Sequence, residues 1–321
     1  MIMATGNAIY HMSFLQAIAI GLLQGISELF PVSSLGHTVL VPSWIGGTWA
    51  TLVRQESQAE SPYLAFVVGL HLATAVVLLG FYFREWARLV AGFLRSLGRR
   101  KAVTDEERLA WLIVIATVPV GALGLVFEHQ FRVLFAKPVA AALFLMANGV
   151  ILLAGERHRR RHERAGADQP AAATGRPGRP GTRLVPMDAA AEHELSRLGV
   201  LSAAIIGASQ ALALLAGISR EGVAMVGGLF RGLDNENAMR FSFLLSTPVI
   251  FAAGALKVPD LLGPLGNGIR PQVIAGSLAA VATSLLAVLF LTRYFRTRTL
   301  MPFAVYSLAF GLASVVRFGV F

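Results

Sequence analysis

Apolar residues recur in blocks of membrane-spanning length along most of the chain. About 20 apolar residues are enough for an α-helix to cross the hydrocarbon core of a bilayer. Six blocks approach that length, and they cover residues 62–83, 110–128, 138–155, 240–255, 272–292 and 300–320. The pattern therefore predicts an all-α polytopic membrane protein with six transmembrane helices.

Four shorter apolar blocks form two pairs, 14–50 and 199–232, and each pair is interrupted near its middle. The first interruption is FPVSS at residues 30–34, and the second is AGISR at residues 216–220. Pro and Gly interrupt helices, and non-helical backbone is tolerated at membrane depth only where it lines a cavity or is buried in protein. We expect each pair to form a re-entrant helix hairpin. A pair of full-length spans is the alternative.

The two pairs resemble each other in sequence. A shift of 186 residues aligns Ser33 with Ser219, and it also matches the Gln nine residues before each Ser and the Gly three residues after it. The chain then divides into two repeats, residues 1–155 and 199–321, each a hairpin followed by three spans. Because three is odd, the second hairpin enters from the opposite side of the membrane. This predicts an inverted repeat with a binding site at mid-membrane.

Lys and Arg gather in every other connection between the blocks. Residues 84–110, 156–198 and 293–298 hold 19 of these cations, whereas the alternate connections hold 5. By the positive-inside rule the first set is cytoplasmic. The stretch 156–198 is also rich in Arg, Pro and Gly, which predicts a disordered cytoplasmic linker.

The composition agrees with this organisation and excludes several functions. Hydrophobic residues make up 55% of the chain and charged residues 14%, against about 25% charged residues in soluble domains. The net charge is +10, but the cations lie between apolar blocks, so they indicate membrane topology and we expect no nucleic-acid partner. The chain has no Cys, which excludes disulfides, thiolate nucleophiles and Cys-ligated metal sites.

An acidic residue lies inside the first apolar hairpin. Glu28 comes four residues after Gln24, so the two side chains share one helix face. A carboxylate in an apolar block is costly and marks a functional site by default. Glu28 could act as a metal ligand or as a general base. The alternative is a purely structural ion pair with Arg220.

The residues after the first helix break suit an anion. Ser33, Ser34 and Gly36 begin a half-helix, and free backbone N–H groups at a helix start bind anions. Histidine titrates near neutral pH, so His37 could transfer a proton or attack phosphorus. The Ser34 hydroxyl could also attack. We predict substrate binding by Ser33 and Gly36 and a catalytic role for Ser34 or His37, in which either attacks or activates water.

The second break carries a cation in an apolar stretch. The guanidinium of Arg220 fits the geometry of a phosphate, and burying it requires an anion. That anion could be Glu28, Glu221 or a substrate. With Gly217 and Ser219 beside Arg220, the two hairpins together predict a site for a phosphate or diphosphate in a lipid-facing cavity.

Four motifs carry a resemblance to one bacterial family. They are QGISELFPVSSLGH at 24–37, QALALLAGISREG at 210–222, FSFLL at 241–245 and PFAVY at 302–306. They are similar to motifs of the undecaprenyl-pyrophosphate phosphatases (BacA/UppP), and the resemblance covers most of the chain. It implies an inverted repeat with two re-entrant hairpins that hydrolyses undecaprenyl diphosphate to undecaprenyl phosphate with a divalent cation, Mg²⁺ or Ca²⁺. Such an enzyme recycles the cell-wall lipid carrier.

The resemblance also implies a setting for the site. The protein would be a multi-pass protein of the bacterial cytoplasmic (inner) membrane that acts on a polyprenyl diphosphate lipid at a site open to the outer face. A homodimer is a candidate assembly. The site residues carried over from the family motifs are Glu28, Ser33, Ser34, His37, Ser219 and Arg220.

The chain departs from the family pattern at both hairpins, as a divergent member would. Gln24 stands where many members have a first carboxylate, and Ala216, Glu221 and Ala224 replace a Pro, a Ser and a Thr of the second motif. Glu221 could supply the carboxylate that Gln24 lacks, which makes Glu28, Glu221 and Gln24 the candidate cation ligands. The other interpretation is a paralogue with weakened hydrolysis.

Two questions stay open from the sequence. Inverted repeats with broken helices are also transporter architecture, so a transporter or flippase of polyprenyl phosphate is the alternative function. His71 lies at the middle of the block 62–83, and it could line the cavity or cap a neighbouring helix.

Overall fold

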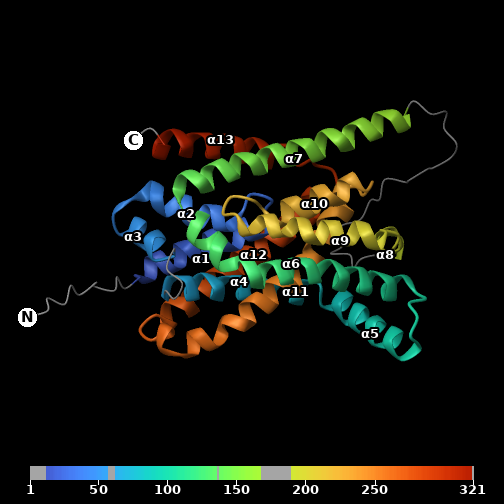
Figure 1. Cartoon of the computed structure of the whole chain (residues 1–321), viewed down its shortest axis with the longest axis horizontal. Helices are drawn as coiled ribbons and strands as arrows, with labels where there is room; N and C mark the ends of the chain where they lie inside the picture. Colours follow the sequence, from blue (N-terminus) through green and yellow to red (C-terminus); the bar gives the residue numbers. More distant parts are fainter. Residues whose placement is uncertain (1–11, 57–61, 136, 168–188, 320–321) are drawn as a thin grey trace, which may run out of the picture.

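The structure is a computed structural model that describes residues 12–56, 62–135, 137–167 and 189–319. Within these ranges it contains helices and no strands (Figure 1). The elements are α1 (Phe14–Leu29), α2 (Ser34–Ile45), α3 (Gly47–Glu56), α4 (Pro62–Phe81), α5 (Phe83–Arg99), α6 (Asp105–Phe135), α7 (Pro138–Ala167), α8 (Ala189–Ser196), α9 (Val200–Ser209), η1 (Gln210–Leu214), α10 (Arg220–Phe230), α11 (Asn235–Leu262), η2 (Pro264–Gly266), α12 (Arg270–Tyr294) and α13 (Met301–Gly319). The prediction of an all-α fold is confirmed.

Five helices among the described residues are long and apolar enough to cross a membrane: α6, α7, α11, α12 and α13. A sixth candidate is the pair α4 and α5, which are bent by 83° at Tyr82. Helix α4 and the five long helices overlap the six predicted blocks, although α6, α11 and α12 extend beyond theirs at both ends and α5 occupies the predicted connection that follows the first block. The chain is therefore a multi-pass membrane protein.

Both predicted hairpins consist of short helices separated by a break. Residues 30–33 separate α1 from α2, and residues 215–219 separate η1 from α10. The two breaks end in the same cap, because the Oγ of Ser33 accepts a bond from the Gly36 N–H (3.2 Å) and the Oγ of Ser219 accepts one from the Gly222 N–H (3.1 Å). Each half is too short to span a bilayer as one helix, which favours the re-entrant form over full-length spans.

Helices of one half of the chain pack against helices of the other half, and corresponding helices make corresponding contacts. Helix α1 packs along α12, and α9 packs along α6, while α4 faces α11 and α7 lies beside α13 (Figure 1). A Cβ on Gly21 of α1 would lie 2.2 Å from the Gly276 carbonyl oxygen, and one on Gly207 of α9 would lie 1.9 Å from that of Ala116. Glycine therefore permits the same close approach in both halves, as in many membrane helix pairs. The inverted orientation of the two repeats stays a prediction.

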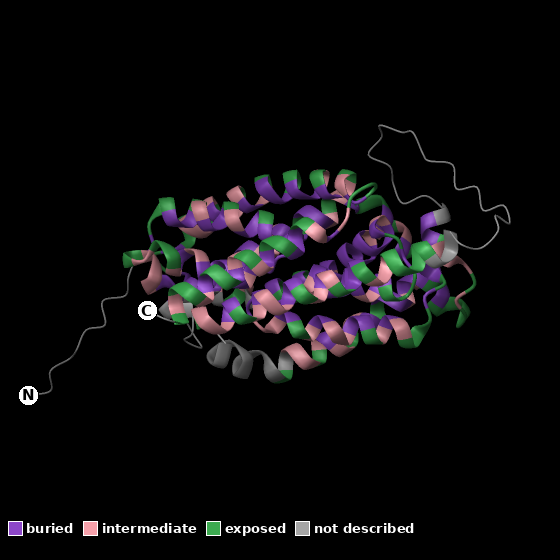
Figure 2. Cartoon of the chain, turned by 90° about the horizontal axis from the view of Figure 1, so that it is seen from above, coloured by how far each residue is buried: buried purple, intermediate pink, exposed green. Residues whose placement is uncertain are grey.

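Buried residues line the inward sides of the helices, and exposed residues follow their outward sides (Figure 2). Many of the exposed side chains are large and apolar, among them Leu201, Leu278 and Leu286. An apolar outward surface suits contact with lipid rather than water.

The stretch 156–198 was predicted to be a disordered linker, and this is wrong at both of its ends. Helix α7 continues to Ala167, and residues 189–196 form α8. The carboxylate of Glu156 supports the extension, because it is fully buried, accepts bonds from Arg159 and Arg160 of the same helix (2.7 Å each) and accepts the Leu300 N–H, which ties the helix to the bundle. Residues 168–188 of the predicted linker lie outside the described residues.

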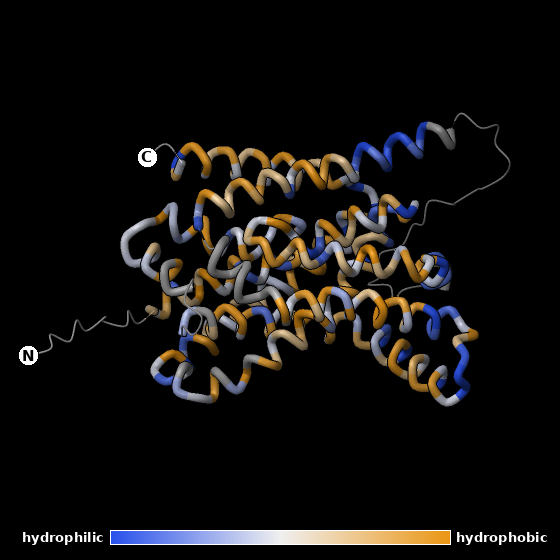
Figure 3. Tube along the Cα trace, viewed as in Figure 1, coloured by the Kyte–Doolittle hydropathy of each residue, from blue (hydrophilic) through white to orange (hydrophobic). Residues whose placement is uncertain are grey.

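The three Lys- and Arg-rich connections meet at one end of the molecule. Figure 3 shows hydrophilic residues gathered at the far end of α7, at α8 and at the α5–α6 connection. Arg88 of α5 bonds Glu192 of α8 (3.1 Å), and the Leu300 N–H donates to Glu156 (3.4 Å). This shared end is the arrangement that the predicted topology requires.

Candidate active site

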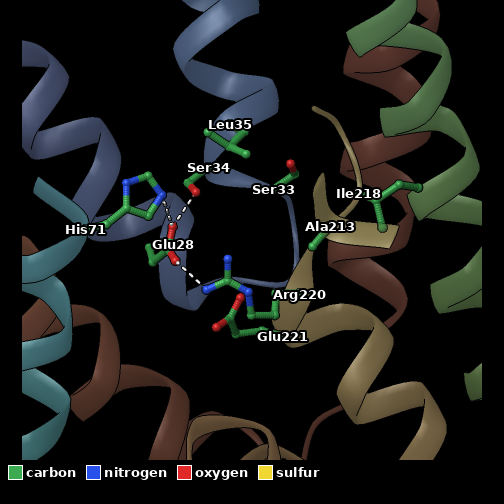
Figure 4. A pocket seen from close by; sticks show the side chains of 9 residues that line it. All are labelled: Glu28, Ser33, Ser34, Leu35, His71, Ala213, Ile218, Arg220 and Glu221. Atoms are coloured by element: carbon green, nitrogen blue, oxygen red, sulfur yellow. Dashed lines mark hydrogen bonds and ion pairs between the residues drawn. The ribbon is translucent and has the colours of Figure 1, made fainter. Parts of the chain in front are cut away.

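A small pocket lies between the two helix breaks and α4. It holds about 260 Å³ of space between protein atoms, part of it open to the outside, and is lined by nine residues (Figure 4), namely Glu28, Ser33, Ser34, Leu35, His71, Ala213, Ile218, Arg220 and Glu221. Charged and hydroxyl side chains from both halves of the chain point toward one another in this space. Such convergence of polar groups inside an apolar bundle is typical of a functional site.

The carboxylate of Glu28 is the centre of the pocket's polar contacts. The Ser34 hydroxyl donates to its Oε2, and so does the Gln24 amide, at 3.0 Å. His71 Nε2 lies 3.2 Å from the same oxygen, and Arg220 Nη1 lies 3.7 Å from Oε1. Only 4% of Glu28 is exposed, so these partners replace water around the charge.

His71 is fixed in one orientation on α4. Its Nδ1 lies 2.9 Å from the Val67 carbonyl oxygen, and since a carbonyl only accepts, Nδ1 carries a hydrogen. The other nitrogen, Nε2, faces Glu28. A hydrogen bond between Nε2 and the Glu28 oxygen needs a further hydrogen, which is carried either by His71 or by the carboxyl of Glu28. His71 therefore lines the pocket, which was one of the two interpretations that the sequence left open.

Arg220 and Glu221 begin α10 and extend into the pocket from the second hairpin (Figure 4). The Nε and Nη1 atoms of Arg220 donate no hydrogen bond within the described part of the chain. The Oε1 atom of Glu221 is buried and likewise lacks a hydrogen-bond partner there. The guanidinium thus keeps donors for an incoming anion, and Glu221 offers a carboxylate oxygen to a cation.

The tips of the two hairpins touch each other directly. The Gly217 N–H donates to the Ser33 Oγ at 3.1 Å, and a Cβ on Gly36 would lie 2.9 Å from the Gly217 Cα. Gly217 has a φ of +120°, a conformation that strongly favours glycine. Ser219 caps α10. Gly36, Gly217 and Ser219 therefore join the tips and are not among the residues that line the pocket.

His37 is held outside the pocket. Its Nδ1 lies 2.7 Å from the Ser33 carbonyl oxygen, and its Nε2 lies 2.7 Å from the hydroxyl of Tyr306 on α13. The His37 and Tyr306 rings are stacked, with centroids 5.7 Å apart. Both ring nitrogens thus have protein partners, and His37 fixes the first hairpin against α13.

The structure brings together five of the predicted site residues and separates others. The pocket is lined by Glu28, Ser33, Ser34, Arg220 and Glu221, whereas Gln24 contacts Glu28 without lining it. Sequence reasoning missed Asn148, which is fully buried and contacts both hairpins. A lone Asn inside the apolar block 138–155 was the signal that could have identified it.

The donor set bears on the expected divalent cation. Within the described ranges no group of three or more His, Cys, Asp or Glu side chains is arranged to hold a metal ion. Mg²⁺, however, is often bound by one or two carboxylates together with substrate phosphates and water. The partnerless oxygen of Glu221, close to Glu28, fits a cation of that kind.

Comparison with known proteins gives one consistent family. The family described as bacitracin resistance protein BacA matches residues 17–313. The chain is 53% identical to "Undecaprenyl-diphosphatase 2" of Frankia alni, covering 97% of this chain and 99% of that protein. It is also 53% identical to "Undecaprenyl-diphosphatase" of Mycolicibacterium paratuberculosis, with 95% and 97% covered, and 38% identical to a Chromobacterium violaceum relative named "Undecaprenyl-diphosphatase 2", with 95% and 99% covered.

Proposed function

The chain belongs to the bacitracin resistance protein BacA family, and we propose that it is an integral membrane enzyme that hydrolyses undecaprenyl diphosphate to undecaprenyl phosphate and inorganic phosphate. The observation that carries the proposal is the juxtaposition of Ser34, Glu28 and Arg220 in one pocket. A hydroxyl, a carboxylate that accepts its hydrogen and a cation with free donors are the groups that phosphoryl transfer requires.

Ser34 is the nucleophile that this geometry favours. Its Oγ attacks the terminal phosphorus while its hydrogen passes to Glu28, with which it is already hydrogen-bonded. The bond between that phosphorus and the bridging oxygen breaks, and undecaprenyl phosphate leaves. The oxygen of a water molecule then attacks the phosphorus of the phosphoserine, one hydrogen of that water returns to the Ser34 Oγ, and hydrogen phosphate leaves. Glu28 releases the proton that it took from Ser34 to the departing phosphate. His37 is less suited to attack, because both of its ring nitrogens are occupied outside the pocket.

Arg220 binds and orients the diphosphate. Its unpartnered Nε and Nη1 donors can bond phosphate oxygens in the pocket. A guanidinium is preorganised for this geometry and gains most where negative charge develops in the transition state. The N-terminal ends of α2 and α10, which begin at Ser34 and Arg220, favour the same anionic charge through their helix dipoles.

The divalent cation, Mg²⁺ or Ca²⁺, is part of the proposal. Glu221 and Glu28 would hold it, with the substrate's phosphates as further ligands. When bound, it would neutralise charge on the diphosphate. Gln24 is a weaker ligand candidate, because its amide nitrogen bonds Glu28 and the residue does not line the pocket.

The proposed location is the bacterial cytoplasmic membrane, with the pocket open to the outer face. The gathering of the cationic connections at one end of the bundle supports a cytoplasmic position for that end. A homodimer stays a prediction, which light scattering of the purified protein can test.

The experiment is phosphate release from undecaprenyl diphosphate by the purified protein, with and without a chelator. We expect chelator-sensitive release. The same protein in liposomes tests the alternative function, because a transporter would move polyprenyl phosphate across the bilayer without releasing phosphate. Movement without hydrolysis would overturn the proposed enzyme.

A further inference from the structure

Asn148 is the point at which α7 contacts both helix breaks. Its Nδ2 donates to the Pro31 carbonyl oxygen at 2.9 Å, and its Oδ1 accepts from the Ser219 N–H at 3.0 Å. Nδ2 also lies 3.3 Å from the Ser307 Oγ on α13. The residue is 0% exposed. One side chain thus joins the first hairpin, the second hairpin and the α7–α13 pair.

The two backbone groups that Asn148 satisfies belong to the helix breaks. The carbonyl of Pro31 and the N–H of Ser219 lie in non-helical backbone, where no intrahelical partner is available. An unsatisfied backbone group at membrane depth is costly. A carboxamide supplies one donor and one acceptor from the same group, so it can satisfy both breaks and hold them at a fixed separation.

That separation decides the geometry of the pocket. Pro31 lies between Glu28 and Ser34 in the chain, and Ser219 directly precedes Arg220. The second break is also pressed against α7, because a Cβ on Gly217 would lie 2.4 Å from the Ala141 carbonyl oxygen. The Asn148 side chain therefore holds both halves of the active site in place relative to α7.

We propose that Asn148 is a positioning residue that fixes the distance between the nucleophile on the first hairpin and the phosphate-binding arginine on the second. The inference rests on the proposed function. It adds a residue that touches neither substrate nor reacting atoms and acts through Pro31 and Ser219. A small displacement of reacting groups lowers the chemical step more than it weakens binding, since a shift of about 1 Å can cost ~100-fold in rate.

The test uses Asn148→Leu, which keeps the branched shape of the side chain and removes both bonds, and Asn148→Ser, whose short side chain cannot reach both breaks. We expect kcat per folded protein to fall about 10- to 100-fold while KM changes much less. Ser314→Ala is the matched control, because Ser314 is also fully buried and accepts a 2.9 Å bond from Trp44 away from the pocket. It is expected to lower Tm without lowering kcat.

A second measurement is independent of hydrolysis. The chain has no Cys, so spin labels at Ile45→Cys and Phe230→Cys, two exposed positions on α2 and α10, report the distance between the helices that follow the breaks. A narrow distribution that broadens in Asn148→Leu or Asn148→Ser supports the proposal. An unchanged distribution, or kcat within twofold of wild type in both variants, would overturn it. A wild-type protein without phosphatase activity would contradict the proposed function, while the distances would still decide the role of Asn148.

Discussion

Glu28 Oε1 and Arg220 Nη1 lie 3.7 Å apart, although the two residues belong to different halves of the chain. Each is a charged group in an apolar segment, and each neutralises the other in the absence of substrate. The guanidinium keeps free donors, so the pair is not a closed structural salt bridge. The pocket needs residues from both halves of the chain, so it can form only where the two hairpins meet.

Replacing either member of this pair should abolish hydrolysis while the protein still inserts and purifies. Glu28→Gln removes the carboxylate that takes the Ser34 proton, and Arg220→Ala removes the guanidinium that donates to the phosphates. We expect each to lower kcat/KM by at least ~100-fold, measured as phosphate release per folded protein. Arg240→Ala is the matched control, since Arg240 is ion-paired with Glu236 (2.7 Å) outside the pocket. Near-wild-type turnover in either pocket variant would remove that residue from the mechanism.

The helix breaks could be predicted from sequence because local chemistry determines them. Pro31 and Gly217 interrupt the helices, and the Ser33 and Ser219 caps follow from a serine at the position directly before each half-helix. The charges of Glu28 and Arg220 were conspicuous because the surrounding residues are apolar. Features of this kind are readable in a short window of sequence.

The contacts of histidines and of Asn148 could not be predicted in the same way. His37 follows Ser34 closely in the chain, but Tyr306 on α13 holds its ring away from the pocket. His71 reaches Glu28 from α4. Which face of a helix meets the site depends on how distant helices pack, and no local pattern encodes that. The helical end of α7 was not predicted, because a segment with many arginines resembles a linker in the sequence. Only the structure shows that Glu156 lies beside these arginines.

We expect His71 to affect the reaction rate through its contact with Glu28 and not to be needed for folding. His71→Ala removes one of the partners that orient the Glu28 carboxylate, and we expect kcat to fall by ~10-fold or more, because a small misplacement of a reacting group slows the chemical step. His71→Gln places an amide that can still donate to Glu28 and should recover part of the rate. Equal loss in both variants, with unchanged Tm, would show that the imidazole itself is required. Wild-type rates in His71→Ala would contradict a role in the site.

The contact between the hairpin tips should tolerate no side chain at Gly217. Gly217→Ala adds a Cβ 2.4 Å from the Ala141 carbonyl oxygen at a φ of +120°. We expect a loss of at least ~1–3 kcal/mol from backbone strain alone, seen as a lower Tm, together with reduced activity. Gly121→Ala in α6 is the control, because its Cβ would meet nothing within 4 Å, and alanine favours a helix by ~0.5–1 kcal/mol. A stable, active Gly217→Ala protein would contradict the tight junction.

The topology can be tested with single cysteines, because the chain has none of its own. Arg161→Cys lies at the cationic end of α7, and Asn267→Cys lies in the η2 connection; both positions are exposed. A membrane-impermeant maleimide added to intact spheroplasts should label only Asn267→Cys, and in inverted vesicles it should label only Arg161→Cys. The opposite pattern would reverse the assignment of sides, including the outer-face opening of the pocket.

Glu221 is the second acidic side chain that lines the pocket. If its partnerless oxygen serves the cation, Glu221→Gln should weaken Mn²⁺ binding in the presence of a non-hydrolysable diphosphate lipid, measured by electron paramagnetic resonance. The divalent-cation concentration needed for half-maximal rate should then rise.

The effects of Glu28→Gln and Glu221→Gln should be non-additive, because neighbours in one site typically couple by about 0.5–3 kcal/mol. Glu236→Gln, which removes a carboxylate outside the pocket, should leave Mn²⁺ binding unchanged. Unaltered cation dependence in Glu221→Gln would instead assign Glu221 to balancing the charge of Arg220, and a faster enzyme would mean that this carboxylate restrains hydrolysis by repelling the diphosphate.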